Sequence, residues 1–160
     1  MIKVGDRLPE ATFRVVTDDG VKPRKASEVF AGKRVVLIGM PGAFTPTCNN
    51  NHLPGFVTHA GNIKAKGVDE IVVTTVNDHW VMHHWSKAAG GHGHIQFLAD
   101  NNAEFAKAIG MEFDATGGLG GLRSKRYAML VDDGVVKVLN IEEQPGKAEI
   151  TTAENMMKSL

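Results

Sequence analysis

Cysteine is almost absent from this chain, since its 160 residues contain only Cys48. A single cysteine cannot form an internal disulfide, which is typical of a reducing compartment, and we expect the cytoplasm. The chain also has no excess charge, because Lys plus Arg and Asp plus Glu each number 18. This balance argues against a protein whose main task is to grip nucleic-acid phosphates or an anionic membrane.

Long apolar runs are missing as well. The longest, Val35 to Met40, is far too short to span a bilayer. The first residues, Met1 to Asp6, lack the basic start and apolar segment of a secretory signal. Repeats, low-complexity segments and long linkers are also lacking, so we expect one domain over residues 1–160.

Segments typical of strands alternate with segments typical of helices, which predicts an α/β fold. Arg34–Gly39 and Glu70–Val76 are apolar on both faces, as are central strands that helices cover on both sides. Ala11–Val16 and Ile95–Leu98 are further candidate strands, and residues 127–141 form a predicted hairpin with an Asp-Gly turn. Two central strands, crossover helices and a terminal hairpin indicate a thioredoxin-like sheet.

Three helices have recognisable start signals. Asn77-Asp78 precedes an apolar pattern that ends at Gly90-Gly91, and Asn101-Asn102 precedes a second pattern that ends at Gly110. Thr151–Glu154 has the spacing of a capping box for a C-terminal helix.

The segment after the first central strand contains the cysteine. Thr45 is a good N-cap, Pro46 then falls at the first helical position, and Cys48 falls at the third. A thiol there lies at the positive end of the helix dipole, an environment that lowers the pKa of a thiol. Pro54 should kink or interrupt this helix. A lone cysteine is otherwise a small buried apolar residue, but the polar flanks here favour a reactive thiol.

Three stretches make the chain similar to a known family. "PGAFTPTC" followed by "HLPGF" resembles the active-site segment of peroxiredoxins, in particular the type-II or peroxiredoxin-5 class. "VNDHWVMHHWSK", Val76–Lys87, and "RSKRYAMLVDDGVVKVLNIE", Arg123–Glu142, resemble two further segments of that class. The resemblance covers nearly the whole chain and implies a thioredoxin-like fold, a central mixed β-sheet flanked by helices, with N-terminal additions.

The resemblance also implies site residues. The peroxidatic cysteine falls on Cys48, the threonine of the motif on Thr45, the proline that ends the strand on Pro41, and the arginine before the aromatic residue on Arg126. Arg123 matches a second arginine of the same segment.

Peroxide reduction explains why these residue types belong together. A thiol of pKa about 8.5 is about 3% ionised at pH 7, and lowering its pKa to about 6 increases the thiolate about thirtyfold. A more acidic thiolate is a weaker nucleophile, so acidity alone is too small an effect. Donors aimed at the O–O bond must supply the rest. We assign Arg126 the fixed charge, Thr45 and nearby backbone N–H groups the orientation of the peroxide, and Pro41 the exclusion of water.

The oxidised cysteine must then be recycled without a second cysteine in the chain. Val72-Val73, where some relatives have one, is apolar. An external thiol is therefore required. The resemblance implies glutathione with glutaredoxin first and thioredoxin second, a homodimer, and no bound cofactor. An exposed Trp80 could lie at the dimer interface.

Other interpretations stay open at this point. Cys48 with His52 could form a cysteine hydrolase or acyl transferase, if the imidazole lies within hydrogen-bond reach of the sulfur. Cys48 could also belong to a non-catalytic redox sensor. Alternatively, His52 only orders the helix that carries the cysteine. The seven histidines suggest no metal site, since adjacent His83 and His84 point to different helix faces. The glycine-rich loop Thr116–Ser124 should carry Arg126 into place.

Overall fold

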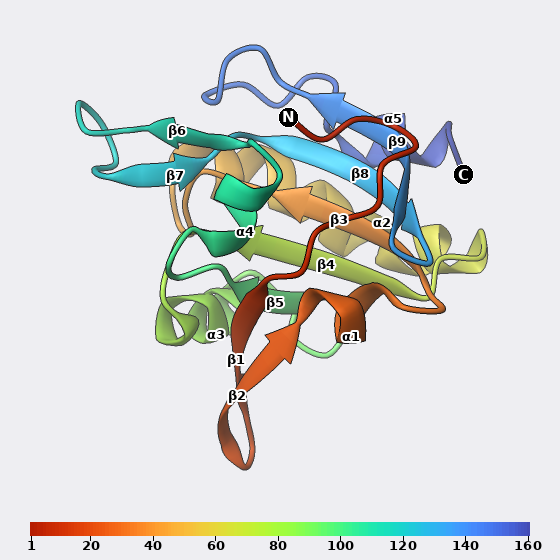
Figure 1. The fold of residues 1–160 in the computed structure, drawn as a ribbon, viewed down its shortest axis with the longest axis horizontal. Coiled ribbons are helices and arrows are strands. Elements are labelled where there is room, and N and C mark those ends of the chain that lie inside the picture. The colour runs from red at the N-terminus through yellow and green to blue at the C-terminus, as the bar shows by residue number, and fades with distance from the viewer.

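The computed structural model describes all residues 1–160 and contains a seven-stranded mixed sheet in the order β2-β1-β5-β4-β3-β8-β9 (Figure 1). Strands β3, β4 and β5 are parallel, whereas β1, β8 and β9 run antiparallel to their neighbours. The strands are β1 (Thr12–Thr17), β2 (Gly20–Lys25), β3 (Arg34–Gly39), β4 (Glu70–Thr75), β5 (Gln96–Ala99), β6 (Glu112–Asp114), β7 (Leu122–Ser124), β8 (Tyr127–Asp132) and β9 (Val135–Ile141). The helices are α1 (Ala26–Phe30), the π-helical turn η1 (Cys48–His52), α2 (Leu53–Ala65), α3 (His79–Ala88), α4 (Glu104–Ala108) and α5 (Ala153–Met157).

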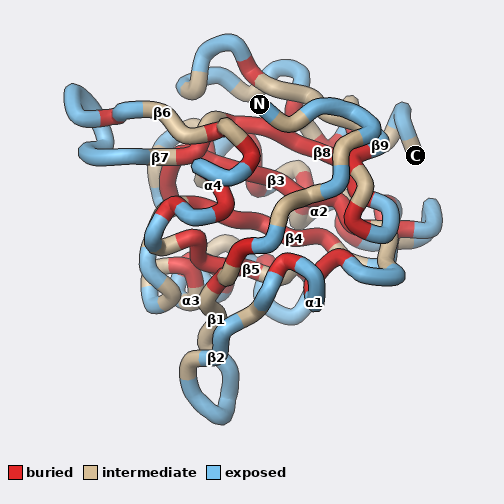
Figure 2. Tube along the Cα trace, in the orientation of Figure 1, coloured by how far each residue is buried: buried red, intermediate tan, exposed pale blue.

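The central strands are buried on both faces, as their apolar sequences predict. Alternate residues of β3 point to opposite sides, so Val36 and Ile38 join one core cluster and Val35 and Leu37 join the other. Figure 2 shows this burial along the middle of the sheet, while the tip of the β1–β2 hairpin is exposed. The thioredoxin-like mixed sheet flanked by helices is confirmed.

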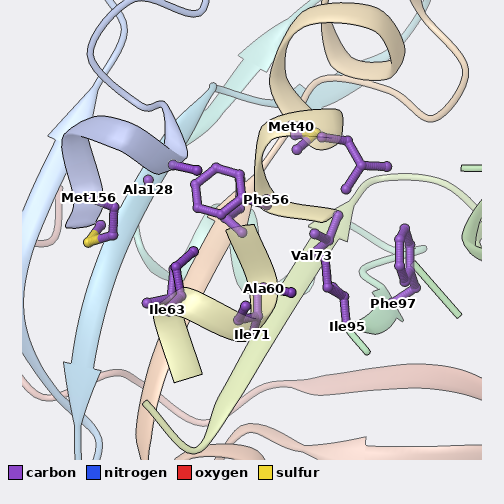
Figure 3. Packing of buried hydrophobic residues seen from close by; sticks show 14 of the residues in the cluster. Met40, Phe56, Ala60, Ile63, Ile71, Val73, Ile95, Phe97, Ala128 and Met156 are labelled. Carbon is purple, nitrogen blue, oxygen red and sulfur yellow. The ribbon is translucent and has the colours of Figure 1, made fainter. Parts of the chain in front are cut away.

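The two faces are covered by different helices. Residues of α2, α3 and α5 pack on the face that includes Val36, and residues of α1 and α4 pack on the face that includes Val35. Figure 3 shows Phe56 of α2 and Met156 of α5 beside the strands of the first face. Each parallel connection, from β3 to β4 through α2 and from β4 to β5 through α3, therefore crosses this face.

The predicted hairpin is confirmed with its Asp-Gly turn. β8 and β9 pair antiparallel, and the turn residues Asp133 and Gly134 have φ values of 47° and 78°. Two consecutive positive φ angles are typical of the tight turns that match the twist of a hairpin. β3 has the predicted bounds, β4 ends one residue before its predicted end, and β1 and β5 are each shifted by one residue.

Two predicted helix caps are wrong. Helix α4 is not capped by Asn101-Asn102: the Asp100 carboxylate accepts hydrogen bonds from the N–H groups of Phe105 and Ala106, at 2.9 Å each. Ala103, with φ 55°, turns the chain so that this earlier side chain reaches the helix start. Helix α5 is capped by Thr152, whose hydroxyl accepts from Asn155 N–H at 3.2 Å, rather than by Thr151.

Short elements at the edges were not predicted. Strand β2 contains Pro23 and alternates charged with apolar residues at an exposed edge, and α1 has only five residues. The small β6–β7 hairpin projects beyond the main sheet (Figure 1). No helix has the length and apolarity needed to cross a membrane.

Candidate active site

Cys48 lies just beyond the end of β3, in the first turn of the helix that crosses back over the sheet. The chain leaves β3 through Met40 and Pro41, and it turns at Phe44, which has φ 62°. Helical backbone begins at Pro46. The side chain of Asn77 fixes the approach, because its Oδ1 accepts a hydrogen bond from Ala43 N–H at 2.9 Å.

Thr45 begins the helix through its backbone and not through its side chain. Its carbonyl accepts the N–H of Asn49 at 2.8 Å, as the carbonyl of an N-cap residue does. The side chain does not take part in this cap, because the Thr45 hydroxyl donates to the carbonyl of Gly42 at 2.7 Å. The hydroxyl proton is therefore engaged, and the lone pairs of the oxygen remain available to accept a hydrogen bond.

The helix continues through Pro54, but its hydrogen-bond pattern changes just before this residue, where the sequence predicts a kink or an interruption. A π-helical turn, Cys48–His52, precedes α2 directly, and Leu53 N–H donates to the Cys48 carbonyl. Pro54 then lies in the first turn of α2. Proline has no N–H, so Pro54 cannot donate the hydrogen bond that a regular α-helix would need at this position. The wider π-helical turn lies just before it.

Arg126 reaches the sulfur from the start of β8. The register Gly39↔Tyr127 brings the beginning of β8 beside the end of β3. Arg126 Nη2 then donates to Cys48 Sγ at 3.1 Å, Nη1 lies 2.9 Å from His52 Nδ1, and Nε donates to the Pro145 carbonyl at 3.0 Å. The guanidinium is only 1% exposed. Its planar donors are thus held in one orientation, with one of them aimed at sulfur.

His52 serves as an acceptor for Arg126. Its Nε2 lies 2.8 Å from the Thr151 carbonyl, which can only accept, so Nε2 carries the proton and Nδ1 accepts from Arg126. Burial, together with the charge of Arg126, lowers the pKa of His52 to about 4. A neutral imidazole of fixed tautomer at this position orients the guanidinium.

The geometry does not form a cysteine–histidine pair. Both ring nitrogens of His52 are engaged, one with Arg126 and one with Thr151, and neither bonds to Cys48. A hydrolase mechanism needs the imidazole to take the thiol proton directly. The arrangement instead provides one sulfur beside one fixed positive charge.

A pocket of about 470 Å³ opens above this pair. Three of the predicted site residues, Pro41, Thr45 and Arg126, line it, together with the glycine-rich loop and the segment at Pro145. Cys48 itself is 0% exposed and lies beneath these side chains. A small molecule in the pocket would therefore meet the guanidinium and Thr45 on its way to the sulfur.

Pro145 and Gly146, at the start of the segment 145–151, line one wall of the pocket and were not singled out from the sequence. Besides the bond to Arg126, the segment accepts the hydroxyl of Thr47 at the Gly146 carbonyl, 2.7 Å away. These contacts use backbone carbonyls of residues about 100 positions from the cysteine, so no local sequence signal marks them. Trp85 likewise supports the π turn, because its Nε1 donates to Asn49 Oδ1 at 2.8 Å.

Arg123 does not reach the sulfur. It donates to the carbonyls of Gly120, Leu119 and Val76 at 3.1, 3.2 and 3.3 Å. It thereby fastens the glycine-rich loop to the end of β4. This differs from the expectation that the loop carries Arg126 into place, since Arg126 is held by its own contacts and by the β3–β8 pairing.

The histidine-rich part of α3 lies away from these contacts. His79 and His83 are four residues apart, and the His83 ring lies 6.0 Å from the ring of His92. No group of three or more His, Cys, Asp or Glu side chains is arranged to hold a metal ion. Trp85 is buried in the core, whereas Trp80 is 54% exposed.

Comparison with known proteins places this geometry in context. The model of the redoxin family matches residues 3–157. The chain is 47% identical over 165 residues to "Peroxiredoxin-2E-2, chloroplastic" of Oryza sativa subsp. japonica, which covers 99% of this chain and 72% of that protein. It is 46% identical over 164 residues to "Peroxiredoxin-2E, chloroplastic" of Arabidopsis thaliana, and this alignment covers 99% of this chain and 69% of that protein.

A solved structure has nearly the same backbone. Reduced Prx3 from Vibrio vulnificus, in complex with hydrogen peroxide, is 48% identical and superposes with a TM-score of 0.94 over 99% of both chains. These similarities extend over nearly the whole sequence, including the segment around the cysteine.

Proposed function

The chain belongs to the redoxin family and, within it, to the type-II peroxiredoxins, which are thiol peroxidases. We therefore propose that it reduces hydrogen peroxide and small organic hydroperoxides through Cys48. The observation that carries the proposal is the 3.1 Å contact between Arg126 Nη2 and Cys48 Sγ at the base of the pocket. A positive charge fixed beside the sulfur favours the thiolate, which is the reactive form of cysteine.

The first step is a two-electron transfer from sulfur to peroxide. The thiolate attacks one peroxide oxygen, an S–O bond forms, and the O–O bond breaks. The other oxygen leaves with the bond electrons and takes up a proton, giving water or an alcohol. Cys48 is left as a sulfenic acid.

Each predicted residue has a role consistent with its contacts. The Arg126 guanidinium faces the sulfur and can stabilise the negative charge that moves onto the leaving oxygen. The Thr45 hydroxyl already donates to Gly42, so it accepts a hydrogen bond from the O–H of the peroxide. Unpaired N–H groups in the first helical turn donate to the peroxide, and Pro41 limits the water in the pocket.

Recycling requires an external thiol and movement of the helix start. The chain has no second cysteine to attack the sulfenic acid. Cys48 has no exposed surface, so the turn that carries it must open before a reductant can reach it. We propose glutathione with glutaredoxin as the reductant and thioredoxin as the second candidate. The external thiol attacks the sulfenic sulfur and releases water, and a second thiol then reduces the mixed disulfide.

The test is steady-state consumption of hydrogen peroxide with the two reductant systems in parallel. We expect turnover with at least one of them, greater with glutathione and glutaredoxin, and none after Cys48→Ser. Substantial turnover by Cys48→Ser would defeat the assignment of the sulfur. Wild-type protein that is oxidised once at Cys48 and never recycled by either system would instead indicate a redox sensor.

We also propose a homodimer that forms beside the pocket. The large apolar residues that are well exposed include Phe44, Trp80, Leu119 and Leu122, at 40–54% each. Phe44 lies close to Pro41 in the sequence, and Leu122 lies next to Arg123. A second subunit that covered these side chains would therefore border the pocket. Analytical ultracentrifugation should show a dimer that Trp80→Glu weakens, and a monomer at all concentrations would refute it. The cytoplasm stays our predicted compartment, although the two rice and Arabidopsis relatives are named chloroplastic.

A further inference from the structure

Two of the three contacts that orient Arg126 lead to the same segment of chain. Arg126 Nε donates to the Pro145 carbonyl directly. Its Nη1 donates to His52, and the tautomer of His52 is fixed in turn by the carbonyl of Thr151. Only Nη2 points at the sulfur. The orientation of the guanidinium therefore depends on the positions of the Pro145 and Thr151 carbonyl groups, both in the segment 145–151.

A single carboxylate oxygen fixes the far end of this segment. Glu142 Oε2 accepts from the N–H groups of Glu149, Ile150 and Thr151 at 2.9, 2.9 and 2.8 Å, and from the Thr151 hydroxyl at 2.7 Å. The Glu142 side chain is buried, with 7% of the residue exposed. Its own N–H donates to the Arg126 carbonyl at 3.0 Å, so the anchor and the arginine are also joined through their backbones.

Glu142 is charged at neutral pH. Burial acts to raise the pKa of its carboxyl, but the hydrogen bonds from Thr151, Ile150 and Glu149 outweigh burial and lower it below the usual value. Hydrogen bonds to an ionised acceptor are about twice as strong as neutral ones. Neutralising this oxygen should therefore loosen the turn at residues 149–151, which contains the Thr151 carbonyl that holds His52.

We propose that Glu142 is a positioning residue for peroxide reduction, because its carboxylate holds the segment that aims Arg126 at Cys48. The inference rests on the proposed peroxidase function and adds a residue that touches neither the sulfur nor the pocket opening at Thr45. The contacts lead from Glu142 to Thr151, from Thr151 to His52, and from His52 to Arg126.

The primary experiment compares Glu142→Gln with Glu143→Gln. Both changes remove one negative charge and keep the side-chain shape, but Glu143 is exposed and makes no side-chain hydrogen bond. Stopped-flow tryptophan fluorescence gives the rate constant for oxidation of reduced Cys48 by hydrogen peroxide. We expect Glu142→Gln to lower this rate constant at least tenfold and Glu143→Gln to change it less than twofold. A change below twofold in Glu142→Gln overturns the proposal.

Two further readouts separate positioning from general destabilisation. The first is the Arg126 Nε–H signal in nitrogen-15 NMR, which is protected by burial and by the Pro145 carbonyl. In Glu142→Gln it should exchange with solvent at least tenfold faster, while core amides such as those of Val36 and Leu130 keep their rates. The second is the same substitution in an Arg126→Ala background, where it should have no further effect on oxidation. An equal loss in both backgrounds would show that Glu142 does not act through Arg126 and would overturn the proposal.

If Glu142→Gln does not fold, a second variant tests the proposal. Thr151→Val removes one of the four donors and should lower the oxidation rate about threefold in wild-type protein and not at all in Arg126→Ala; no loss in the wild-type background overturns the proposal. If the wild-type protein fails to react with peroxide, the proposed function fails. The NMR exchange of Arg126 Nε–H still reports whether Glu142 holds the guanidinium.

Discussion

The two faces of the sheet differ in what they are built from. The face under α2, α3 and α5 contains Cys48 at its edge, and Arg126 and His52 are buried beside it with each of their side-chain nitrogens in a hydrogen bond. The face under α1 and α4 has an apolar core, in which the rings of Phe13 and Phe105 lie tilted to each other with their centroids 5.0 Å apart. Two adjacent residues where β8 begins illustrate the division: Arg126, just before the strand, contacts the sulfur, and Tyr127, its first residue, joins the opposite cluster.

The comparison implies that one face carries chemistry and the other only stability. Alternation along a strand makes this separation possible within a few residues. Substitutions on the α1/α4 face should therefore change the free energy of unfolding and leave the oxidation rate of the folded protein alone. Substitutions on the face under α2, α3 and α5 should change the oxidation rate of Cys48, with or without a loss of stability.

The largest effect is expected from opening a cavity on the apolar face. Phe105→Ala should lower the free energy of unfolding by about 3–5 kcal/mol, because Phe105 is only 1% exposed and contacts Phe13. Urea unfolding measures the loss, and stopped-flow oxidation at low temperature measures the rate. The matched change Phe56→Ala, whose ring packs 5.6 Å from that of His52, should lower both quantities. An equal loss of rate in Phe105→Ala would break the division.

The next effect tests the charge beside the sulfur. Arg126→Ala should slow the oxidation of Cys48 about a thousandfold, or about 4 kcal/mol in activation free energy, since it removes the donor aimed at the reacting atoms. Circular dichroism should show a folded protein. Arg123→Ala is the matched control, because its guanidinium binds only loop carbonyls, and we expect a much smaller change. An unchanged rate in Arg126→Ala would remove this residue from the site.

A third effect follows from the buried imidazole. The pKa of His52 is about 4 in the folded protein and near 6.5 when unfolded, so only the unfolded chain takes up a proton in between. Stability from this group is fully present above about pH 6.5 and is lost as the pH falls towards 4. The loss amounts to about 3 kcal/mol. Urea unfolding of wild-type protein and His52→Gln across this range isolates the contribution, and parallel pH curves for the two would contradict the assignment.

The smallest effect concerns the orientation of the peroxide. Thr45→Val keeps the shape and removes the acceptor oxygen, and we expect about a tenfold slower oxidation, equal to about 1.4 kcal/mol. Thr45→Ser retains the hydroxyl and should stay within about threefold of wild type. The measurement is again stopped-flow oxidation by hydrogen peroxide. If the serine variant is as slow as the valine variant, the methyl group and not the oxygen carries the effect.

The parts of the fold that depend on neighbouring residues in the sequence could be predicted from sequence patterns. Strand β3 and the β8–β9 hairpin follow from apolar runs and an Asp-Gly turn, which need no knowledge of distant contacts. The caps of α4 and α5 differ from the prediction because distant contacts and backbone turns, and not sequence position alone, decide which polar side chain reaches the first N–H groups. The backbone at Ala103 lets Asp100 reach the helix, and Thr151 is engaged by Glu142.

The site was predictable as a set of residues and not as a network. The motif around Cys48 and the arginine before Tyr127 identify the pair, and the β3–β8 register explains why they meet. The contacts of Arg126 with Pro145, and of His52 with Thr151, join backbone carbonyls to side chains 19 and 99 positions away. Backbone groups are the same in every residue, so no residue type could have signalled them.

The single thiol also makes the motion of this part of the protein measurable. Cys48 is the only thiol in the chain and has no exposed surface, so an alkylating reagent such as a bulky maleimide can react only while the turn Cys48–His52 is open. The labelling rate at saturating reagent then counts opening events directly, without background from other thiols and without an engineered probe. The same measurement on the sulfenic form, with a reagent selective for that state, would report how oxidation alters the frequency of opening.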